Sequence, residues 1–180
     1  MKLDVVPDPE PWYADGLTFT CTQCGNCCTG GPGYVWMSEE EVGRLAAFLK
    51  ISEGEVLSKY CRRIGERISL DERRMPNGNY DCIFLKEIDP PAQPASKQGK
   101  LESAEVLPMK RRGCSIYPVR PLQCRTWPFW HGNLASRQAW DLASKKCPGM
   151  DRGKREFSQI QIEELRDARD WPEKPPTSAG

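Results

Sequence analysis

Four of the nine cysteines in this 180-residue chain lie close together, in the run C-T-Q-C-G-N-C-C. Cys21, Cys24 and Cys27 are each separated by two residues. A Cys-x2-Cys turn brings two sulfurs within reach of one metal ion, and its backbone N–H groups point at the thiolates and stabilise their charge. Gly25 permits the tight backbone that such a turn requires. The spacing therefore predicts that thiolates bind a metal here.

The run ends in a doubled cysteine, Cys27 followed by Cys28. Adjacent residues point their side chains in different directions, so we expect that both sulfurs do not enter one compact tetrahedron. Either the pair serves two centres, or one thiol bridges or lines a single site. Four cysteines further along complete a set of eight, enough for two four-thiolate centres, and favour the first alternative: Cys82, Cys114, Cys124 and Cys147.

Two other uses of cysteine fit this sequence less well. Disulfide frameworks are typical of short secreted chains with an even number of cysteines, whereas this chain has nine. The start M-K-L-D-V-V-P-D-P-E has no apolar signal region, and no segment approaches the ~18 apolar residues of a membrane span, so we expect a cytoplasmic protein with reduced thiols. A catalytic cysteine would need a base, and the single histidine, His131, lies in a turn-like H-G-N-L context. The sequence does not identify a catalytic residue.

Two helix starts are clearly marked. The stretches 38–41 (S-E-E-E) and 52–55 (S-E-G-E) both fit the S-x-x-E capping box, and apolar residues follow each at helical spacing. The second apolar stripe contains Cys61, together with Val56, Leu57, Tyr60, Ile64 and Ile68. A thiol in such a stripe behaves as a small apolar group, so we expect Cys61 to lie in the core and to bind no metal.

The rest of the chain is rich in turns, with 16 prolines, and predicts little long regular structure. We expect a small single α+β domain with short strands, the two N-terminal helices and a cysteine-lined metal core. Pro121 is expected to open a single helical turn that carries Cys124. Short strands are expected within residues 17–20, 34–37, 80–85 and 106–117, and a weak helix over 157–170.

These elements predict the limits of the domain. The cysteine-cluster metal-binding domain is expected over residues 17–150, with an exposed loop over 89–103. An irregular arm over 1–16 precedes it. A helical segment over 151–170 and a disordered tail over 171–180 follow it.

Charge excludes some classes of partner. The net charge is +1, which gives no electrostatic basis for binding nucleic acid or an anionic membrane. Arg120 and Arg125 flank Cys124, and we expect them to compensate the negative charge of a thiolate centre or to form ordinary surface pairs. Trp127 and Trp130 are expected to shield the metal site from water.

The cysteine run, together with C-I-F-L at 82–85 and C-S-I-Y-P-V-R-P-L-Q-C-R-T-W-P-F at 114–129, resembles the YkgJ-like cysteine-cluster family. That family is described as a zinc- or iron-chelating domain with a C-x2-C-x2-C-C signature. Related domains occur in flagellin lysine methylases, which implies that some relatives work within protein-modifying enzymes. The sequence leaves the enzyme class open between an iron–sulfur oxidoreductase and a component of a protein-modifying system. The resemblance implies metal binding by Cys21, Cys24, Cys27, Cys28, Cys82, Cys114, Cys124 and Cys147.

In one respect the chain departs from the family pattern. Cys82 and Cys114 are usually closer together, and the loop over 89–103 lengthens the gap. Loop insertions cost little free energy, so both cysteines remain predicted ligands.

The spacing also bears on the choice of metal. Cys-x2-Cys-x2-Cys is similar to the start of a bacterial ferredoxin run, whereas structural zinc usually pairs two separate Cys-x2-Cys knuckles, and only one is present. These rules favour an iron–sulfur centre over zinc. Two functions follow: electron transfer or another redox reaction with a protein redox partner, or a zinc-stabilised structural or adaptor protein without catalysis.

Overall fold

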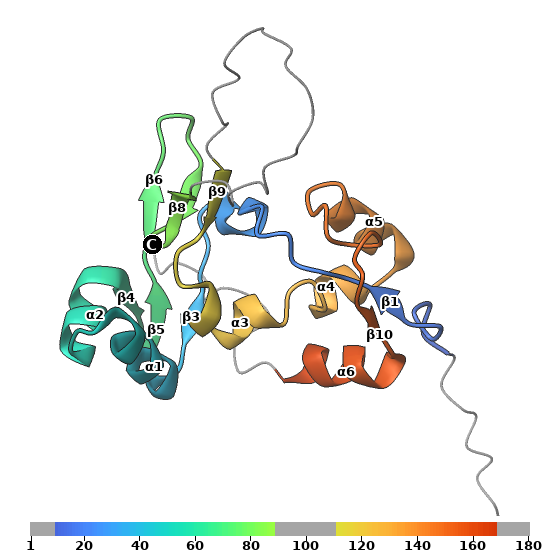
Figure 1. Cartoon of the computed structure of the whole chain (residues 1–180), viewed down its shortest axis with the longest axis horizontal. Helices are drawn as coiled ribbons and strands as arrows, with labels where there is room; N and C mark the ends of the chain where they lie inside the picture. The colour runs from blue at the N-terminus through green and yellow to red at the C-terminus, as the bar shows by residue number, and fades with distance from the viewer. Residues whose placement is uncertain (1–9, 89–110, 169–180) are drawn as a thin grey trace, which may run out of the picture. The chain divides into compact units, whose positions relative to one another are not determined.

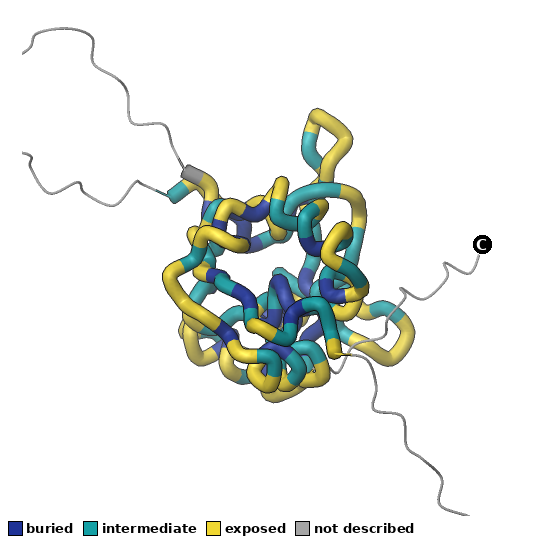
Figure 2. Tube along the Cα trace, turned by 90° about the vertical axis from the view of Figure 1, so that its right-hand side faces the viewer, coloured by how far each residue is buried: buried dark blue, intermediate teal, exposed yellow. Residues whose placement is uncertain are grey.

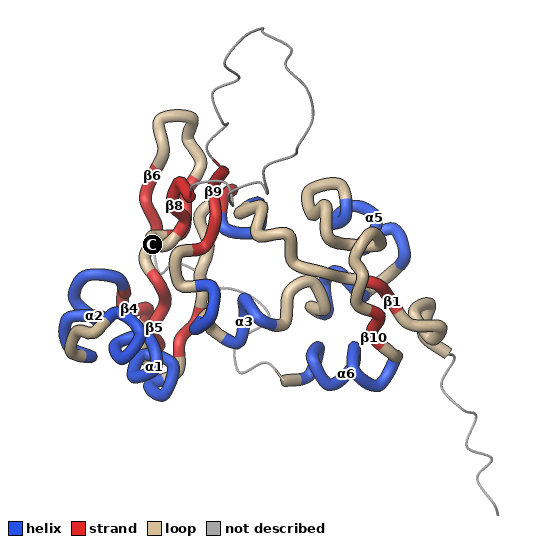
Figure 3. The backbone as a smooth tube through the Cα atoms, in the orientation of Figure 1, coloured by secondary structure: helices blue, strands red, loops and turns tan. Residues whose placement is uncertain are grey.

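The computed structural model describes residues 10–88 and 111–168 (Figure 1). Backbone contacts group these residues into two compact units. The terminal unit contains residues 10–22 and 126–168, and the central unit contains residues 23–88 and 111–125. Both combine helices with short antiparallel strands, which confirms the α+β class (Figure 3). The predicted loop over 89–103 and the tail over 171–180 lie outside the described residues, and the predicted domain limits stay predictions.

The strands of the central unit form three small antiparallel sheets. The first has the order β3-β5-β4, the second β2-β7-β6, and the third is the pair β8-β9. Their bounds are β2 Thr29–Gly30, β3 Trp36–Met37, β4 Cys61–Ile64, β5 Arg67–Leu70, β6 Glu72–Arg74, β7 Tyr80–Cys82, β8 Leu85–Ile88 and β9 Arg111–Cys114. The strand predicted over 80–85 is thus two strands, β7 and β8, joined by a turn that buries Phe84.

Both predicted capping boxes are present. Ser38 begins α1 (Glu39–Leu49) and Ser52 begins α2 (Glu53–Tyr60), and each serine side chain accepts a hydrogen bond from the backbone of the glutamate three residues later. The apolar faces of the two helices pack on the strands in a shared core. Figure 2 colours all buried residues along the chain dark blue. This core contains Met37, Val42, Leu45, Ala46, Val56, Leu70, Phe84 and Ile116.

The second helix is shorter than the sequence predicts, so the placement of Cys61 on a helical stripe is wrong. Helix α2 ends at Tyr60, and Cys61 opens β4, opposite Leu70 of β5. Gly65, with φ 58°, allows the two-residue turn that folds β4 back on β5. Apolar residues in a hairpin can match a helical spacing by chance. Cys61 still packs, half-buried, against the central core.

The terminal unit pairs the two ends of the chain's described part. Strands β1 (Leu17–Thr18) and β10 (Glu156–Phe157) are antiparallel, and Phe19 forms a bridge with Met150. Helices α4 (His131–Leu134), α5 (Arg137–Ser144) and α6 (Gln159–Asp167) complete the unit, of which the sequence predicts only α6. The core is largely aromatic and contains Tyr13, Leu17, Phe19, Phe129, Leu134, Trp140, Cys147, Met150, Phe157 and Ile162.

Helix length and polarity bear on one further class of protein. Among the described residues, no helix combines the length and the apolar character needed to cross a lipid bilayer.

Candidate metal centre

The cysteine run folds as a tight turn in the central unit. The backbone of Gln23 and of Gly25 is left-handed, with φ 55° and 75°, and the Cys28 N–H donates to the Gly25 carbonyl at 2.9 Å. This closes the 3-10 turn η1 (Asn26–Cys28). A Cβ on Gly25 would lie 2.7 Å from Leu85 Cδ1, because the turn packs against the β8–β9 pair. Glycine is therefore required at position 25 for both conformation and space.

The adjacent thiols of Cys27 and Cys28 point to the same side of this turn. Their Sγ atoms are 3.8 Å apart. With Zn–S bonds of ~2.3 Å, two thiolates on one tetrahedral ion are separated by about 3.8 Å. The two sulfurs therefore lie closer together than the expected divergence of adjacent side chains implies, and the division of the pair between two centres stays a prediction. The pair has the spacing of two ligands to one ion.

Strand pairing brings two more cysteines to the turn. In the β2–β7 pair, Thr29 lies opposite Asp81, so Cys28, the residue directly before β2, lies beside Cys82 of β7. In the β8–β9 pair, Cys114 lies opposite Leu85, three residues after Cys82. The thiols at both ends of the long interval between positions 82 and 114 are thus placed by hydrogen-bonded strand pairs.

Cys124 comes from the single-turn helix α3 (Leu122–Arg125). The Cys124 N–H donates to the Pro121 carbonyl at 2.9 Å, which confirms that Pro121 opens this turn. The buried carboxylate of Glu41 accepts a hydrogen bond from the Leu122 N–H. Gln123 accepts from the Trp36 N–H at 2.9 Å and donates to the Tyr34 carbonyl at 3.0 Å. Residues 80 or more positions earlier therefore hold the cysteine-bearing turn.

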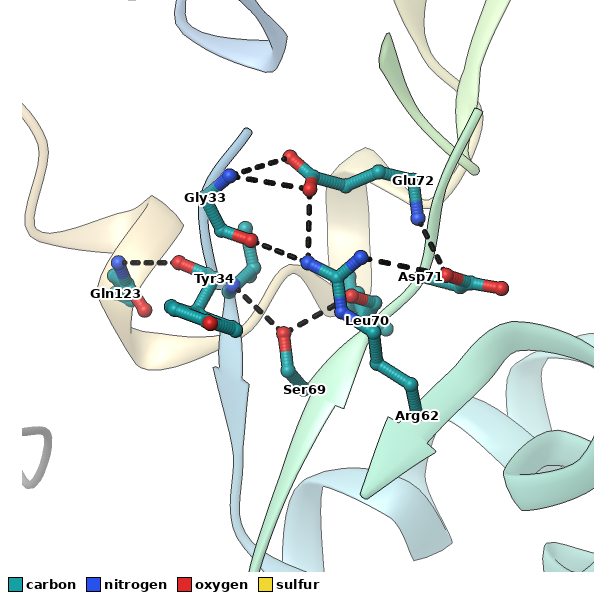
Figure 4. Close-up of polar contacts among 9 residues, drawn as sticks. Gly33, Tyr34, Arg62, Ser69, Leu70, Asp71, Glu72 and Gln123 are labelled. Carbon is teal, nitrogen blue, oxygen red and sulfur yellow. Dashed lines mark hydrogen bonds and ion pairs between the residues drawn. The ribbon is translucent and has the colours of Figure 1, made fainter. Parts of the chain in front are cut away.

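The segment that leaves the cysteine run is fixed by a polar network (Figure 4). The Glu72 carboxylate accepts two contacts from the Gly33 N–H, at 3.1 and 3.2 Å, and pairs with Arg62 at 2.8 Å. Arg62 also donates to the Gly33 carbonyl, and the Val35 N–H donates to Ser69 Oγ at 3.1 Å. The backbone after Thr29 is thus tied to β5 and β6.

The thiols of the turn influence one another's protonation. A hydrogen bond with the Cys28 thiol lowers the pKa of Cys27 to about 7, and the charge of Arg120 acts in the same direction. The same hydrogen bond raises the pKa of Cys28, with burial as the second cause. The first proton of the pair therefore leaves near neutral pH, and the second is retained. A metal ion that replaces this proton would hold both sulfurs as thiolates.

The other thiols of the central unit belong to the same electrostatic neighbourhood. Burial raises the pKa of Cys82 to about 11, and charge on Cys114 and Cys27 acts in the same direction. Burial also raises the pKa of Cys124, and the charges of Cys82, Cys27 and Cys114 add to the effect. We call these residues the five-thiol cluster: Cys27, Cys28, Cys82, Cys114 and Cys124.

Of the two arginines predicted to compensate thiolate charge, Arg120 acts on the cluster. Its charge opposes the rise in the pKa of Cys124 and helps to lower that of Cys27. Its guanidinium lies 3.6 Å from the ring centroid of Tyr117, and its Nε donates to the Tyr117 carbonyl at 3.0 Å. Arg125 instead lies 3.7 Å from the Glu41 carboxylate.

A known protein family shares this arrangement of cysteines in its sequence. Residues 20–148, more than half of the chain, match the family CxxCxxCC, whose description is "Putative zinc- or iron-chelating domain". The chain belongs to the CxxCxxCC family. The match confirms the resemblance seen in the sequence and supports metal binding, by zinc or by iron.

A relative extends the same picture. The chain is 29% identical over 117 residues to "Uncharacterized protein MJ0661" of Methanocaldococcus jannaschii, an alignment that covers 65% of this chain and 48% of the relative. The chain thus spans about half the length of that curated relative. No solved structure matches.

Two predicted ligands, one from the CxxCxxCC signature and one far from it in the sequence, lie in the terminal unit. Cys21 is half-buried and Cys147 is buried, and both pack with the aromatic core of that unit. The Thr20 N–H donates to the Gly149 carbonyl at 3.1 Å, so a shared backbone contact brings the two cysteines near one another. Their grouping with the five-thiol cluster stays a prediction.

The predicted shielding residues, Trp127 and Trp130, also lie in the terminal unit. Their rings meet edge to face with centroids 4.9 Å apart, and Trp127 packs against the same core as Cys21. The lone histidine, His131, begins α4, and its Nε2 lies 3.4 Å from Asp167.

The thiols gather in the CxxCxxCC domain without converging on one point. Within residues 10–88 and 111–168, no group of three or more Cys, His, Asp or Glu side chains is arranged to hold a metal ion. The pair Cys27–Cys28 has the spacing of ligands, and Cys82 and Cys114 lie close enough to Cys124 to raise its pKa.

Three polar residues that position the cysteines are absent from the sequence-based site. The sequence predicts Glu41 only as a capping-box residue, and it does not single out Gln123 or Asp81. All three are buried and make hydrogen bonds to segments distant in the sequence. Two of these residues have a signal in the sequence. Asp81 directly precedes Cys82, and Gln123 directly precedes Cys124, so each is a polar residue adjacent to a predicted ligand.

Proposed function

We propose that this CxxCxxCC protein binds a metal ion in its central unit, with Cys27 and Cys28 as two ligands to the same ion. The observation that carries the proposal is the 3.8 Å separation of the two sulfurs, the spacing about one tetrahedral zinc or iron ion. Two thiols of the remaining three in the cluster, Cys82, Cys114 and Cys124, complete a four-thiolate set.

The donor set decides which metals fit. Thiolate-only sites suit zinc and iron–sulfur clusters. In a four-iron cluster each iron takes one thiolate, which does not suit two sulfurs as close as those of Cys27 and Cys28. A single tetrahedral ion fits them, and so does a two-iron cluster, in which each iron takes two thiolates and four cysteines are needed.

Two functions correspond to these centres. A single zinc ion would stabilise the fold of the central unit, because metal-binding energy is also folding energy in small domains. A two-iron cluster would serve electron transfer with a protein redox partner. The second candidate is supported by the division of the cluster into the Cys27–Cys28 pair and the group that comes from β7, β9 and α3.

Anaerobic purification followed by metal and acid-labile sulfide analysis tests the proposal. One zinc or iron per chain without sulfide indicates the single-ion centre, and two irons with two sulfides indicate the two-iron cluster. A preparation that holds no metal, and takes up none from added Zn²⁺ or Fe²⁺ with the thiols reduced, contradicts the proposal.

The remaining predicted ligands are tested by metal counting. Cys21, Cys24, Cys147 and the fifth thiol of the cluster stay in the predicted set, and each single Cys→Ala variant reports whether that residue holds metal. A central-unit ion held by cluster thiols alone predicts that Cys21→Ala and Cys147→Ala retain the Cys27–Cys28 ion.

A further inference from the structure

We infer that Asp81 is a positioning residue, which holds three cysteine-bearing segments in the arrangement that a metal requires; the inference rests on the proposed function. Asp81 lies in β7 and is 1% exposed. It is not a predicted ligand. Both of its carboxylate oxygens are engaged by residues from other segments of the central unit.

The contacts of Asp81 reach in two directions. Oδ1 accepts a hydrogen bond from Thr29 Oγ1 at 2.6 Å, and Oδ2 pairs with the guanidinium of Arg112. Thr29 belongs to β2, in the same sheet as β7, whereas Arg112 belongs to β9, in a separate sheet. The Asp81 side chain therefore joins two sheets that share no strand.

Each of these segments carries a thiol of the cluster next to its contact with Asp81. Thr29 directly follows Cys28, Asp81 directly precedes Cys82, and Arg112 comes two residues before Cys114. The contacts span 52 and 31 positions of sequence. One buried carboxylate thus links the three thiol-bearing segments that the β2–β7 and β8–β9 pairs place near one another.

A purely structural role explains the charge of Asp81 poorly. A buried carboxylate is costly unless it is paired, and this one lies beside thiols that must become negative to bind a metal. A neutral side chain would serve the packing of β7 at a lower electrostatic cost. The charge of Asp81 is explained by its ion pair with Arg112, which holds strand β9 beside the five-thiol cluster. Outer contacts of this kind typically change metal affinity 10–100-fold when they are removed.

The test compares Asp81→Asn with a variant that weakens the same unit elsewhere. Ser52→Ala removes the α2 cap without touching a cysteine-bearing segment, so it serves as the control for lost stability. Co²⁺ affinity is measured on the reduced full-length chain by competition with a chromophoric chelator, and thiolate-to-cobalt absorption reports how many sulfurs bind. We expect Asp81→Asn to lower the affinity roughly 10–100-fold and to weaken the absorption, while Ser52→Ala retains both.

The outcomes separate the inference from the proposed function. Wild-type affinity and absorption in Asp81→Asn would show that Asp81 serves the fold alone, and would overturn the inference while the proposed function stands. If Asp81→Asn does not fold, Thr29→Val removes only the hydroxyl contact. A smaller fall in affinity then supports the inference, and an unchanged affinity overturns it.

Failure of the proposed function itself would show as a wild-type chain that binds no Co²⁺. The positioning role then has a metal-free readout, the linking of Cys28 to Cys82 by a bifunctional thiol reagent, mapped by mass spectrometry. A link formed in the wild type and lost in Asp81→Asn supports the role of Asp81. Equal linking in both chains contradicts it.

Discussion

The central and terminal units hold their cysteines by different means. In the central unit the thiols lie on turns and strand ends that polar residues fix in place: Asp81, Glu41 and Gln123 are buried, and each makes hydrogen bonds to a distant segment. In the terminal unit Cys21 and Cys147 pack with aromatic side chains. A thiol held by packing keeps its place through apolar contacts. A thiol held by polar tethers depends on every charge and hydrogen bond around it.

The two cores differ in the same sense. In the terminal core the ring of Phe129 stacks on that of Trp140, with centroids 5.9 Å apart. The Phe129 ring also packs against that of Phe157, with centroids 4.7 Å apart. Aromatic side chains bury large areas and contribute strongly to stability. The central core is built mainly from aliphatic side chains, with Phe84 as an aromatic member, beside a cluster of five thiols. We therefore expect metal to matter for the stability of the central unit far more than for that of the terminal unit.

The largest expected effect is that of Cys28→Ser. The substitution removes one of two sulfurs with ligand spacing, so the central-unit metal should be lost. In small metal domains the binding energy, on the order of 10 kcal/mol, is also folding energy. Metal analysis and thermal unfolding should therefore show a metal-depleted protein with an early transition. A Cys28→Ser chain with the wild-type metal content and melting temperature would contradict the shared-ion geometry.

The second prediction concerns the aromatic core of the terminal unit. Trp140 is fully buried, and Trp140→Ala should lower the free energy of unfolding by about 3–5 kcal/mol, the usual cost of removing a large aromatic side chain. The central-unit metal should be retained, since the tethers of that unit are untouched. Denaturant unfolding and metal analysis measure the two effects. Leu142→Ala, on the same helix but 64% exposed, is the matched control and should change neither.

The comparison of units also shows which parts of the fold a sequence can predict. The prediction of the two capping boxes is confirmed, because a serine and a glutamate three residues apart satisfy the backbone locally. The helical turn at Pro121 is predictable for the same reason. The end of α2 is not, since the apolar spacing through Cys61 fits a helix and a hairpin equally well, and only pairing with β5 selects the hairpin.

The candidate site divides in the same way. The spacing of the cysteine run predicts a metal-binding turn, and the CxxCxxCC family match supports that prediction. The approach of the adjacent thiols to 3.8 Å is not predicted by the sequence, because the rotamers of the two side chains set this distance and no local sequence pattern specifies them. The role of Asp81 depends on partners 52 and 31 positions away, and no local pattern contains that information.

An intermediate effect is expected for Gly25→Ala. The new Cβ would approach Leu85 Cδ1 to 2.7 Å in a backbone with φ 75°, so we expect a loss of about 2 kcal/mol together with a lower metal affinity. Gly78 provides the control, because it has φ 82° and a Cβ added there would meet no atom within 4 Å. Gly78→Ala should show the backbone strain without the loss of metal. Equal metal affinities in the two variants would mean that the turn does not need its contact with the β8–β9 pair.

The smallest effect is expected for Cys61→Ala, which separates a packed thiol from the tethered ones inside the central unit. Cys61 is half-buried against the central core, and removal of its sulfur should cost about 1 kcal/mol near pH 7 while the metal content stays unchanged.

The same variant has an expected pH dependence, because burial raises the pKa of Cys61 from 9.0 to about 11. A thiol whose pKa is raised by folding stabilises the native state below the unfolded pKa, and this contribution is lost as the pH rises through the folded pKa. The difference in unfolding free energy between wild type and Cys61→Ala should therefore shrink between pH 9 and about 11, as followed by denaturant unfolding. A variant that loses metal would place Cys61 among the ligands, and a difference that grows with pH would contradict the buried thiol.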